Sequence, residues 1–187
     1  MRIVGGEFKG RAIVAPQGRD TRPTSDRARE SIFNVLAHAA WSPGVEGRRV
    51  LDLFAGSGAL GFEAMSRGAA FALFVETESA ARGAIRDNIE ALGLFGNTRI
   101  HRRYATDLGP KPAGLGGLFE IVFLDPPYGK GLGERAIEGL GKGAWITPDA
   151  LIMLEVGADE TPNLVAFEIL DERGYGAARV FFLKPRA

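Results

Sequence analysis

Continuous apolar runs and helical periodicity alternate along most of this chain. Runs of consecutive apolar residues are typical of strands buried on both faces, whereas apolar residues that recur every three or four positions predict helices. Strands are expected at residues 49–53, 71–75, 99–103, 119–124 and 150–156. Helices are expected between them at residues 58–67, 79–92 and 134–140. This alternation predicts an α/β fold, in which a mostly parallel sheet is covered by helices on both faces.

The N-terminal residues depart from this alternation. Two short apolar runs, 1–4 and 11–15, flank a Gly-rich segment and predict a small β-hairpin. A polar arm at 18–24 leads to a helix that Thr24 or Ser25 can cap. We therefore expect a hairpin and a helix as an N-terminal extension of the core.

The C-terminal residues depart from it in another way. Two β-type runs at 164–170 and 178–184 are separated by a polar turn, and they predict an antiparallel hairpin that completes a seven-stranded sheet. We expect a single domain over residues 1–187. It would comprise a basic hairpin and arm at 1–25 and a Rossmann-like core at 26–187.

The composition excludes several classes of function. The chain has 187 residues, no cysteine and two histidines, so a disulfide scaffold, a thiolate zinc site and a cysteine nucleophile are excluded, and we expect no metal. The N-terminus lacks the apolar core of a signal peptide, and no apolar run approaches the length of a membrane span. We expect a cytoplasmic monomer that does not bind membranes.

The charge is balanced overall but unevenly distributed. A net charge of zero argues against nucleic-acid binding, which usually requires a basic surface. However, residues 120–172 carry a net charge of −8, and residues 1–29 carry +4. This asymmetry is compatible either with chance segregation on a solvated surface or with a basic interaction face near the N-terminus.

A glycine-rich turn follows the first core strand. Residues 56–61 match the dinucleotide motif G-x-G-x-x-G, and Glu76 ends the next strand, 20 residues after Gly56, where a ribose-binding acid would lie. A nicotinamide-dependent enzyme is therefore one interpretation. Tight packing of a strand against a helix also requires glycine, so the motif alone does not decide the function.

Asp52 favours a different cofactor. It lies four residues before Gly56, where an acid would repel an anionic pyrophosphate but attract a cationic sulfonium and ammonium group. Alternatively, its carboxylate could stabilise the backbone of the turn. The pattern D-x-F-x-G-x-G resembles the S-adenosylmethionine loop of Rossmann-like class I methyltransferases. The cofactor-binding residues that this resemblance implies are Asp52, Phe54, Ala55, Gly56, Gly58 and Glu76.

A second motif, Asp125-Pro126-Pro127-Tyr128, follows the apolar run at 119–124 and should lie at the same edge of the sheet. The prolines remove two backbone donors, which leaves the Asp125 carboxylate and the Pro126 carbonyl as acceptors for an exocyclic amine. Tyr128 offers a ring on which a base can stack. An ordinary Pro-rich turn is the alternative. The two motifs together resemble amino methyltransferases, with these four residues as the catalytic ones.

The start of the first helix narrows the substrate. The pattern R-P-T-x-D-R-x-R-E-x-x-F-N at 22–34 resembles the RsmD family, bacterial methyltransferases that modify guanine N2 in 16S ribosomal RNA. Residues 2–6 and 9–11 are also similar to the beginning of that family. The resemblance covers essentially the whole chain. It implies S-adenosylmethionine as cofactor and 16S rRNA, free or in a small-subunit assembly particle, as partner. The implied RNA-binding residues are Arg11, Arg22, Thr24, Arg27 and Arg29.

The chain departs from the family pattern in two places, and the milder departure is Thr77-Glu78, which follows Glu76 where the family more usually has a Lys or Asn before Asp. After the third core strand the family usually has Asp-Ala, whereas this chain has Tyr104-Ala105, with Asp107 two residues later. Ala105 is expected beside the cofactor by this resemblance. The group that contacts the adenine ring stays open.

Three alternatives to a guanine-N2 methyltransferase are considered. The Asp-Pro-Pro-Tyr motif would equally serve an adenine-N6 methyltransferase acting on DNA or RNA, and only the N-terminal motif separates the two. A non-catalytic cofactor-binding RNA module would be expected to lack an intact second motif. A nicotinamide enzyme would leave Asp52 and the second motif without a purpose.

Overall fold

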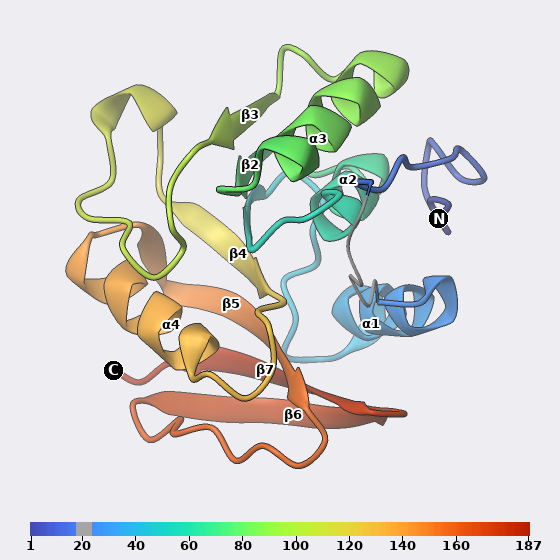
Figure 1. The fold of residues 1–187 in the computed structure, drawn as a ribbon. Helices are drawn as coiled ribbons and strands as arrows, with labels where there is room; N and C mark the ends of the chain where they lie inside the picture. Colours follow the sequence, from blue (N-terminus) through green and yellow to red (C-terminus); the bar gives the residue numbers. More distant parts are fainter. Residues whose placement is uncertain (18–23) are drawn as a thin grey trace.

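The fold is built on one twisted, seven-stranded sheet (Figure 1). The computed structural model describes residues 1–17 and 24–187, so Arg22 lies outside the described residues. The strand order is β3-β2-β1-β4-β5-β7-β6. The strands are β1 (Arg49–Leu53), β2 (Phe71–Val75), β3 (Thr98–His101), β4 (Phe119–Leu124), β5 (Ile146–Gly157), β6 (Phe167–Tyr175) and β7 (Ala178–Pro185). The first five are parallel, whereas β7 runs antiparallel to both β5 and β6.

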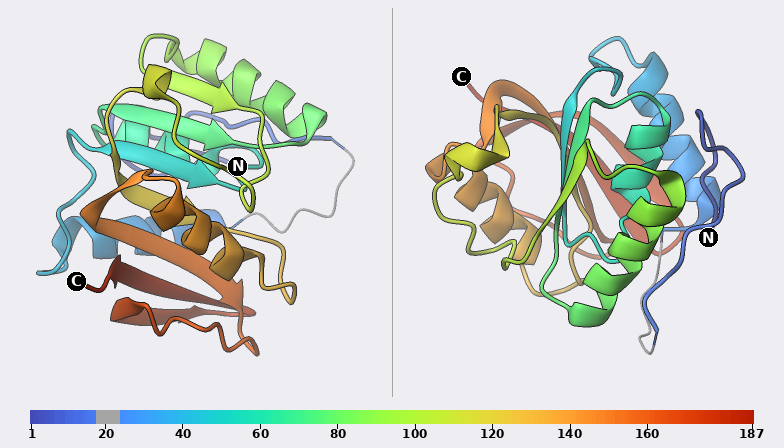
Figure 2. Two further views of the ribbon diagram at one scale, coloured as in Figure 1. Left: turned by 90° about the vertical axis from the view of Figure 1, so that its left-hand side faces the viewer. Right: turned by 90° about the horizontal axis from the view of Figure 1, so that it is seen from above.

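Helices cover both faces of this sheet, as predicted (Figure 2). The helices are α1 (Asp26–His38), α2 (Ala59–Ser66), α3 (Ser79–Leu92) and α4 (Leu132–Lys142), with a short 3₁₀ turn, η1 (Ala113–Leu115). Seen from above in Figure 2, α1, α2 and α3 lie on one side of the sheet and α4 lies on the other. Each face has its own apolar core, because successive strand residues point to opposite faces. The predicted Rossmann-like architecture with its C-terminal hairpin is confirmed.

The N-terminal segment forms a compact loop with little regular β-structure. Arg2 and Ala12 form one isolated antiparallel bridge, so the predicted hairpin is present only as a single pair. The segment is instead attached to the end of α2, where Ser66 accepts hydrogen bonds from the amides of Glu7 and Phe8 at 2.8 and 2.9 Å. Glycine weakens a strand, so this segment forms few hydrogen bonds between strands. The two hydrogen bonds to Ser66 hold it in place instead.

The C-terminal hairpin is longer than predicted. β6 continues to Tyr175, and residues 171–175, which the sequence placed in a turn, pair with β7. Two ion pairs make this polar stretch compatible with a strand: Arg173 pairs with Asp171 along β6 at 2.8 Å, and Arg179 of β7 pairs across the ladder with Glu172 of β6 at 2.6 Å. Opposite charges facing each other across an antiparallel ladder stabilise it.

The described part of the chain contains no helix long and apolar enough to cross a bilayer. In an open sheet of parallel strands, ligands bind at the carboxyl ends of the strands, and these ends are the main candidate for a ligand site.

Candidate active site

The loop between β1 and α2 turns sharply because three of its residues adopt left-handed backbone angles. These are Phe54, Gly56 and Gly58, with φ of 56°, 58° and 80°. At Gly58 a Cβ would lie 2.6 Å from the ring of Phe62, so packing of α2 excludes a side chain there. A Cβ at Gly56 would meet no atom within 4 Å. The space beside Gly56 is open, and a ligand can approach the backbone there.

Asp52 lies beneath this loop and is almost completely buried, with 1% of its surface exposed. Its Oδ2 accepts a hydrogen bond from the amide of Gly61 in the first turn of α2, at 3.0 Å. Burial raises the pKa of Asp52 well above its usual range, and the nearby Glu76 carboxylate raises it further. The side chain thus stabilises the turn, as in the alternative interpretation of its role.

Glu76, at the end of β2, connects that strand to the glycine loop. Its Oε2 accepts from the amide of Gly56 at 2.8 Å, and its Oε1 accepts from the amides of Thr77 and Glu78 at 2.9 and 3.0 Å. A carboxylate offers about four acceptor positions, so capacity for a ligand hydroxyl remains. The half-buried Ala55 continues the loop, and its amide donates to the carbonyl of Val75 at 3.1 Å.

The residues that follow β3 have contrasting environments. Ala105 is buried in the core that faces α4, whereas Tyr104 is 68% exposed. Asp107 is also exposed, and its amide donates to the carbonyl of Tyr104 at 3.0 Å. Ala105 can therefore offer only an apolar wall, and the polar groups available at this end of the site are those of Tyr104 and Asp107.

The Asp-Pro-Pro-Tyr segment forms a polar cluster with two residues from other elements. Thr24, just before α1, has its Oγ1 3.0 Å from Oε2 of Glu155 and 3.4 Å from Oδ2 of Asp125. The hydroxyl of Tyr128 donates to Oε1 of Glu155 at 2.6 Å. Pro126 is buried under the segment. Asp125 and Tyr128, which are neighbours in sequence, are thus joined through a strand residue 30 positions away.

The cluster favours a protonated carboxyl. Burial raises the pKa of Asp125 well above its usual range, and the charges of Glu155 and Asp52 add to this effect. Within residues 1–17 and 24–187, neither Asp125 nor Glu155 forms an ion pair. Asp125 is therefore suited to receive or hold a proton.

The loop after Tyr128 is held in place by Glu160. Its carboxylate accepts from the amide of Gly129, at 2.5 Å, and from that of Gly157 at the end of β5. A Cβ on Gly157 would lie 3.4 Å from the Tyr128 ring, which shows how closely the ring packs on β5. Pro127 is exposed at the tip of this segment.

A groove of about 520 Å³ leads to this cluster. One wall is the start of α1, and the other is the turn between β6 and β7. Its polar lining residues are Thr24, Ser25, Arg27, Ser31, Tyr128, Glu155 and Tyr175. The groove therefore gives a large ligand access to Tyr128 and Glu155 from outside the molecule.

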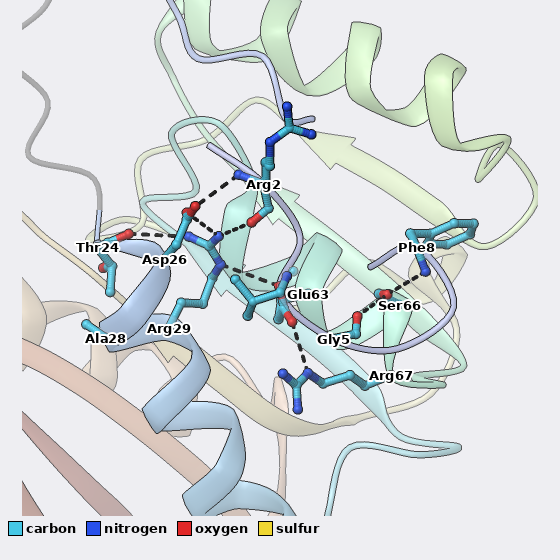
Figure 3. Close-up of polar contacts among 12 residues, drawn as sticks. Arg2, Gly5, Phe8, Thr24, Asp26, Ala28, Arg29, Glu63, Ser66 and Arg67 are labelled. Carbon is cyan, nitrogen blue, oxygen red and sulfur yellow. Dashed lines mark hydrogen bonds and ion pairs between the residues drawn. The ribbon is translucent and has the colours of Figure 1, made fainter. Parts of the chain in front are cut away.

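The structure corrects the expectation for Arg29. Its side chain is completely buried, so it cannot contact a phosphate. Figure 3 shows it at the centre of a network in which it pairs with Asp26 at 2.8 Å and with the buried Glu63 at 3.4 Å. It also donates to the carbonyls of Arg2 and, at 3.3 Å, Thr24. A buried guanidinium requires such partners, and here they join the N-terminal loop, α1 and α2.

The other residues expected to bind RNA differ from Arg29. Arg27, two positions earlier on α1, is exposed and lines the groove. Arg11 is exposed, and its Nη2 donates to the carbonyl of Ala91 near the end of α3, at 2.6 Å. Thr24 lies at the carboxyl cluster, as described above. Among the described residues that were expected to bind RNA, Arg11 and Arg27 therefore have a charge that a phosphate can reach.

Glu155 was not singled out from the sequence. A signal was present, since it is one acid within the apolar run 150–156. Because Leu124 of β4 pairs with Leu154 of β5, the following residues, Asp125 and Glu155, are direct neighbours on parallel strands. This juxtaposition depends on the register between strands and could not be read from either segment alone.

Comparisons with known proteins identify relatives of this chain. Residues 1–184 match the family model described as "Conserved hypothetical protein 95". The chain is 40% identical, over 83% of its length and 74% of the relative's, to "Ribosomal RNA small subunit methyltransferase D" of Escherichia coli. It is 34% identical to "Putative rRNA methyltransferase YlbH" of Bacillus subtilis, with both chains covered completely. A solved structure described as a putative methyltransferase from Escherichia coli has a TM-score of 0.80 and 34% identity, covering 100% of this chain and 98% of that one.

Proposed function

Because the chain belongs to the family described as Conserved hypothetical protein 95, the RsmD family, we propose that it methylates the N2 amine of a guanine in 16S rRNA. The target would be a guanine of the 966 type. The observation that carries the proposal is that the open glycine loop and the Asp125 cluster lie at one edge of the sheet, on the adjacent strands β1 and β4.

S-adenosylmethionine is the cofactor, and the residues of the loop fit it. The open space at Gly56 admits a ligand next to the backbone, and Glu76 keeps acceptor capacity for ribose hydroxyls. Phe54 and Ala55 are half-buried and supply apolar surface on either side of the turn. When bound, the cofactor supplies an electrophilic methyl group. The role of the chain is to hold that group and the amine in line.

Asp125 and the carbonyl of Pro126 would orient the amine by accepting its two hydrogens. Neither Pro126 nor Pro127 has a backbone N–H, so no backbone donor at these two positions competes for the nitrogen lone pair. An amine held in this way can direct its lone pair at the methyl carbon. Tyr128 would stack on the guanine ring, and its hydroxyl, bonded to Glu155, keeps the ring in place.

The groove between α1 and the β6–β7 turn would receive the target nucleotide and its neighbours. Arg27 lines it and would neutralise a phosphate, which adds affinity that depends on salt and not on base sequence. A base that is paired in the RNA must be flipped out or already unpaired to reach Tyr128.

The deciding experiment supplies labelled S-adenosylmethionine with undermethylated 16S rRNA, either free or in assembled small subunits, and digests the product to nucleosides. N2-methylguanosine supports the proposal. N6-methyladenosine would instead select the adenine methyltransferase, which the Asp-Pro-Pro-Tyr chemistry would also permit. Comparison of free RNA with the particle identifies the better substrate.

A further inference from the structure

Two carboxyl groups from neighbouring strands face each other at the centre of the proposed site. Asp125 follows β4, and Glu155 lies near the end of β5, one residue beyond the Leu124–Leu154 pair. Both belong to the face of the sheet that α1 and α2 cover, because the leucines before them point into the opposite core. Glu155 is 4% exposed, so little water can solvate a negative charge on it.

The hydroxyl groups around the pair all favour a charge on Glu155. Tyr128 donates to its Oε1 at 2.6 Å, and Thr24 Oγ1 lies closer to its Oε2, at 3.0 Å, than to Asp125, at 3.4 Å. Asp125 is half-buried and receives only the longer of these two contacts. The other ionisable group that acts on it is Asp52 of β1, which is also acidic. Among the described residues no cation pairs with either carboxyl, and two adjacent negative charges on neighbouring strands would repel each other.

We propose that Glu155 is a positioning residue that shares one proton with Asp125, and that the pair takes up the proton which the amine loses on methylation. This inference rests on the proposed function. Before reaction the pair carries one proton and one negative charge, with the proton on Asp125 and the charge on Glu155. The unprotonated oxygen of Asp125 accepts the hydrogen bond from the amine.

The step balances in atoms and charge. The lone pair of the amine nitrogen forms the new N–C bond, while the electrons of the C–S bond move to sulfur. The methylated nitrogen then loses a proton to Asp125, whose own proton moves to Glu155. The pair ends neutral as the sulfonium loses its positive charge. No net charge is left in the buried site either before or after transfer, which a low-dielectric environment favours.

The pair can be tested without RNA or cofactor. The measurement is a pH titration of the side-chain carboxyl carbons by carbon-13 NMR on the whole protein. In the wild type we expect Asp125 and Glu155 to titrate together in two separated steps. Glu155→Gln keeps a similar shape and an acceptor for Tyr128, and we expect Asp125 to titrate in one step in this variant. Independent titration of the two groups in the wild type would overturn the proposal.

Kinetics on rRNA then separate a role in proton transfer from a role in folding. For Glu155→Gln we expect kcat to fall about 100-fold with little change in KM, which is the lower end of the range typical of acid–base assistance because Asp125 is still present. The pH profile of kcat should lose one of its two ionisations. Glu155→Asp retains a second carboxyl, and we expect it to restore the two-step titration and part of kcat.

A matched control is available on β4, the strand that precedes Asp125. Glu120, at the opposite end of β4, is half-buried and pairs with Arg48 at 3.1 Å. We expect Glu120→Gln to keep the wild-type pH profile, and a Glu155→Gln profile identical to that of the control would refute the proposal. If the wild type methylates no guanine while the two carboxyls still titrate as a pair, the proposed function fails and the shared proton stands.

Discussion

Arg27 and Arg29 lie in the first turns of α1, and the family resemblance implies RNA binding for both. In the structure Arg27 is exposed, whereas Arg29 is buried. We predict that Arg29→Met destabilises the protein severely, whereas Arg27→Met does not. Arg29 is buried and bonded to Asp26, Glu63 and the carbonyl of Thr24. Methionine replaces the stem of the side chain and removes every one of these hydrogen bonds.

The expected loss in the free energy of unfolding depends on the acidic partner, Glu63, that Arg29→Met leaves buried. Removing one partner of a buried ion pair costs about 3–5 kcal/mol, because the remaining charge is desolvated and unpaired. Here Glu63 keeps a pair with Arg67 and a hydrogen bond from the amide of Val4, both at 3.0 Å. We therefore expect the lower end of the range, about 3 kcal/mol. Arg27 is exposed, and its loss should change stability by less than about 0.5 kcal/mol.

Urea unfolding followed by circular dichroism measures this difference. With a slope of about 2 kcal/mol per molar urea, a loss of 3 kcal/mol lowers the midpoint by about 1.5 M. RNA binding at several salt concentrations gives the complementary test. Arg27→Met should reduce the salt slope by about 1, and folded Arg29→Met should leave it unchanged. The opposite result would refute the structural role of the buried Arg29: Arg29→Met would keep the wild-type stability, and its RNA binding would depend less on salt concentration.

Three further predictions concern the edge of the sheet. Asp125→Ala should abolish methyl transfer while leaving cofactor affinity nearly intact, as isothermal calorimetry with S-adenosylmethionine can check; normal turnover would contradict the acceptor role. Gly58→Ala should destabilise the fold by about 1–3 kcal/mol, because its φ is 80° and its Cβ would lie 2.6 Å from Phe62. Gly56→Ala meets no neighbour and bears only the backbone strain of a φ of 58°, about 1 kcal/mol, so it should destabilise the fold less than Gly58→Ala while lowering cofactor affinity. Equal behaviour of the two variants in thermal melts and calorimetry would contradict an open space for the ligand beside Gly56. Burial raises the pKa of Asp52 above its unfolded value, so its contribution to stability is present at low pH and lost as pH rises through the folded-state pKa. The stability of Asp52→Asn relative to the wild type should therefore increase from pH 4 upward, and a difference independent of pH would argue against a raised pKa.

The burial of Arg29 shows what sequence reasoning can overlook. Arg29, Ile32, Phe33 and Leu36 follow the spacing i, i+3, i+4, i+7, which marks the buried face of a helix. The periodicity therefore already contained the signal. The family resemblance implied an RNA contact for Arg29, but a basic residue stays exposed only when no internal acid is available to pair with it.

The net charge of residues 1–29 also differs from the charge that these residues expose in the structure. The excess of basic residues at 1–29 indicated an interaction surface, yet part of it is used internally by Arg29. Arg11 and Arg27 remain exposed. Net charge over a segment therefore overestimates the charge that a polyanion would meet.

The sequence by itself determined the α/β class, the order of the central elements and the two motifs. These features are local: periodicity sets each strand and helix, and glycine or proline sets each turn. The extension of β6 to Tyr175 is a departure that involves non-local contacts, because residues 171–175 pair with β7 and Glu172 forms an ion pair with Arg179 on that strand.

Only the tertiary structure decided which side chains meet. Thr24, Asp125 and Glu155 lie in three separate segments, and they converge because β4 and β5 pair in one register while α1 packs across their ends. The same packing turned Arg29 inward and left Arg27 in the groove. Contacts of this kind depend on the relative placement of distant segments, which local patterns do not encode. They are also the contacts that set the protonation and the geometry of the proposed site.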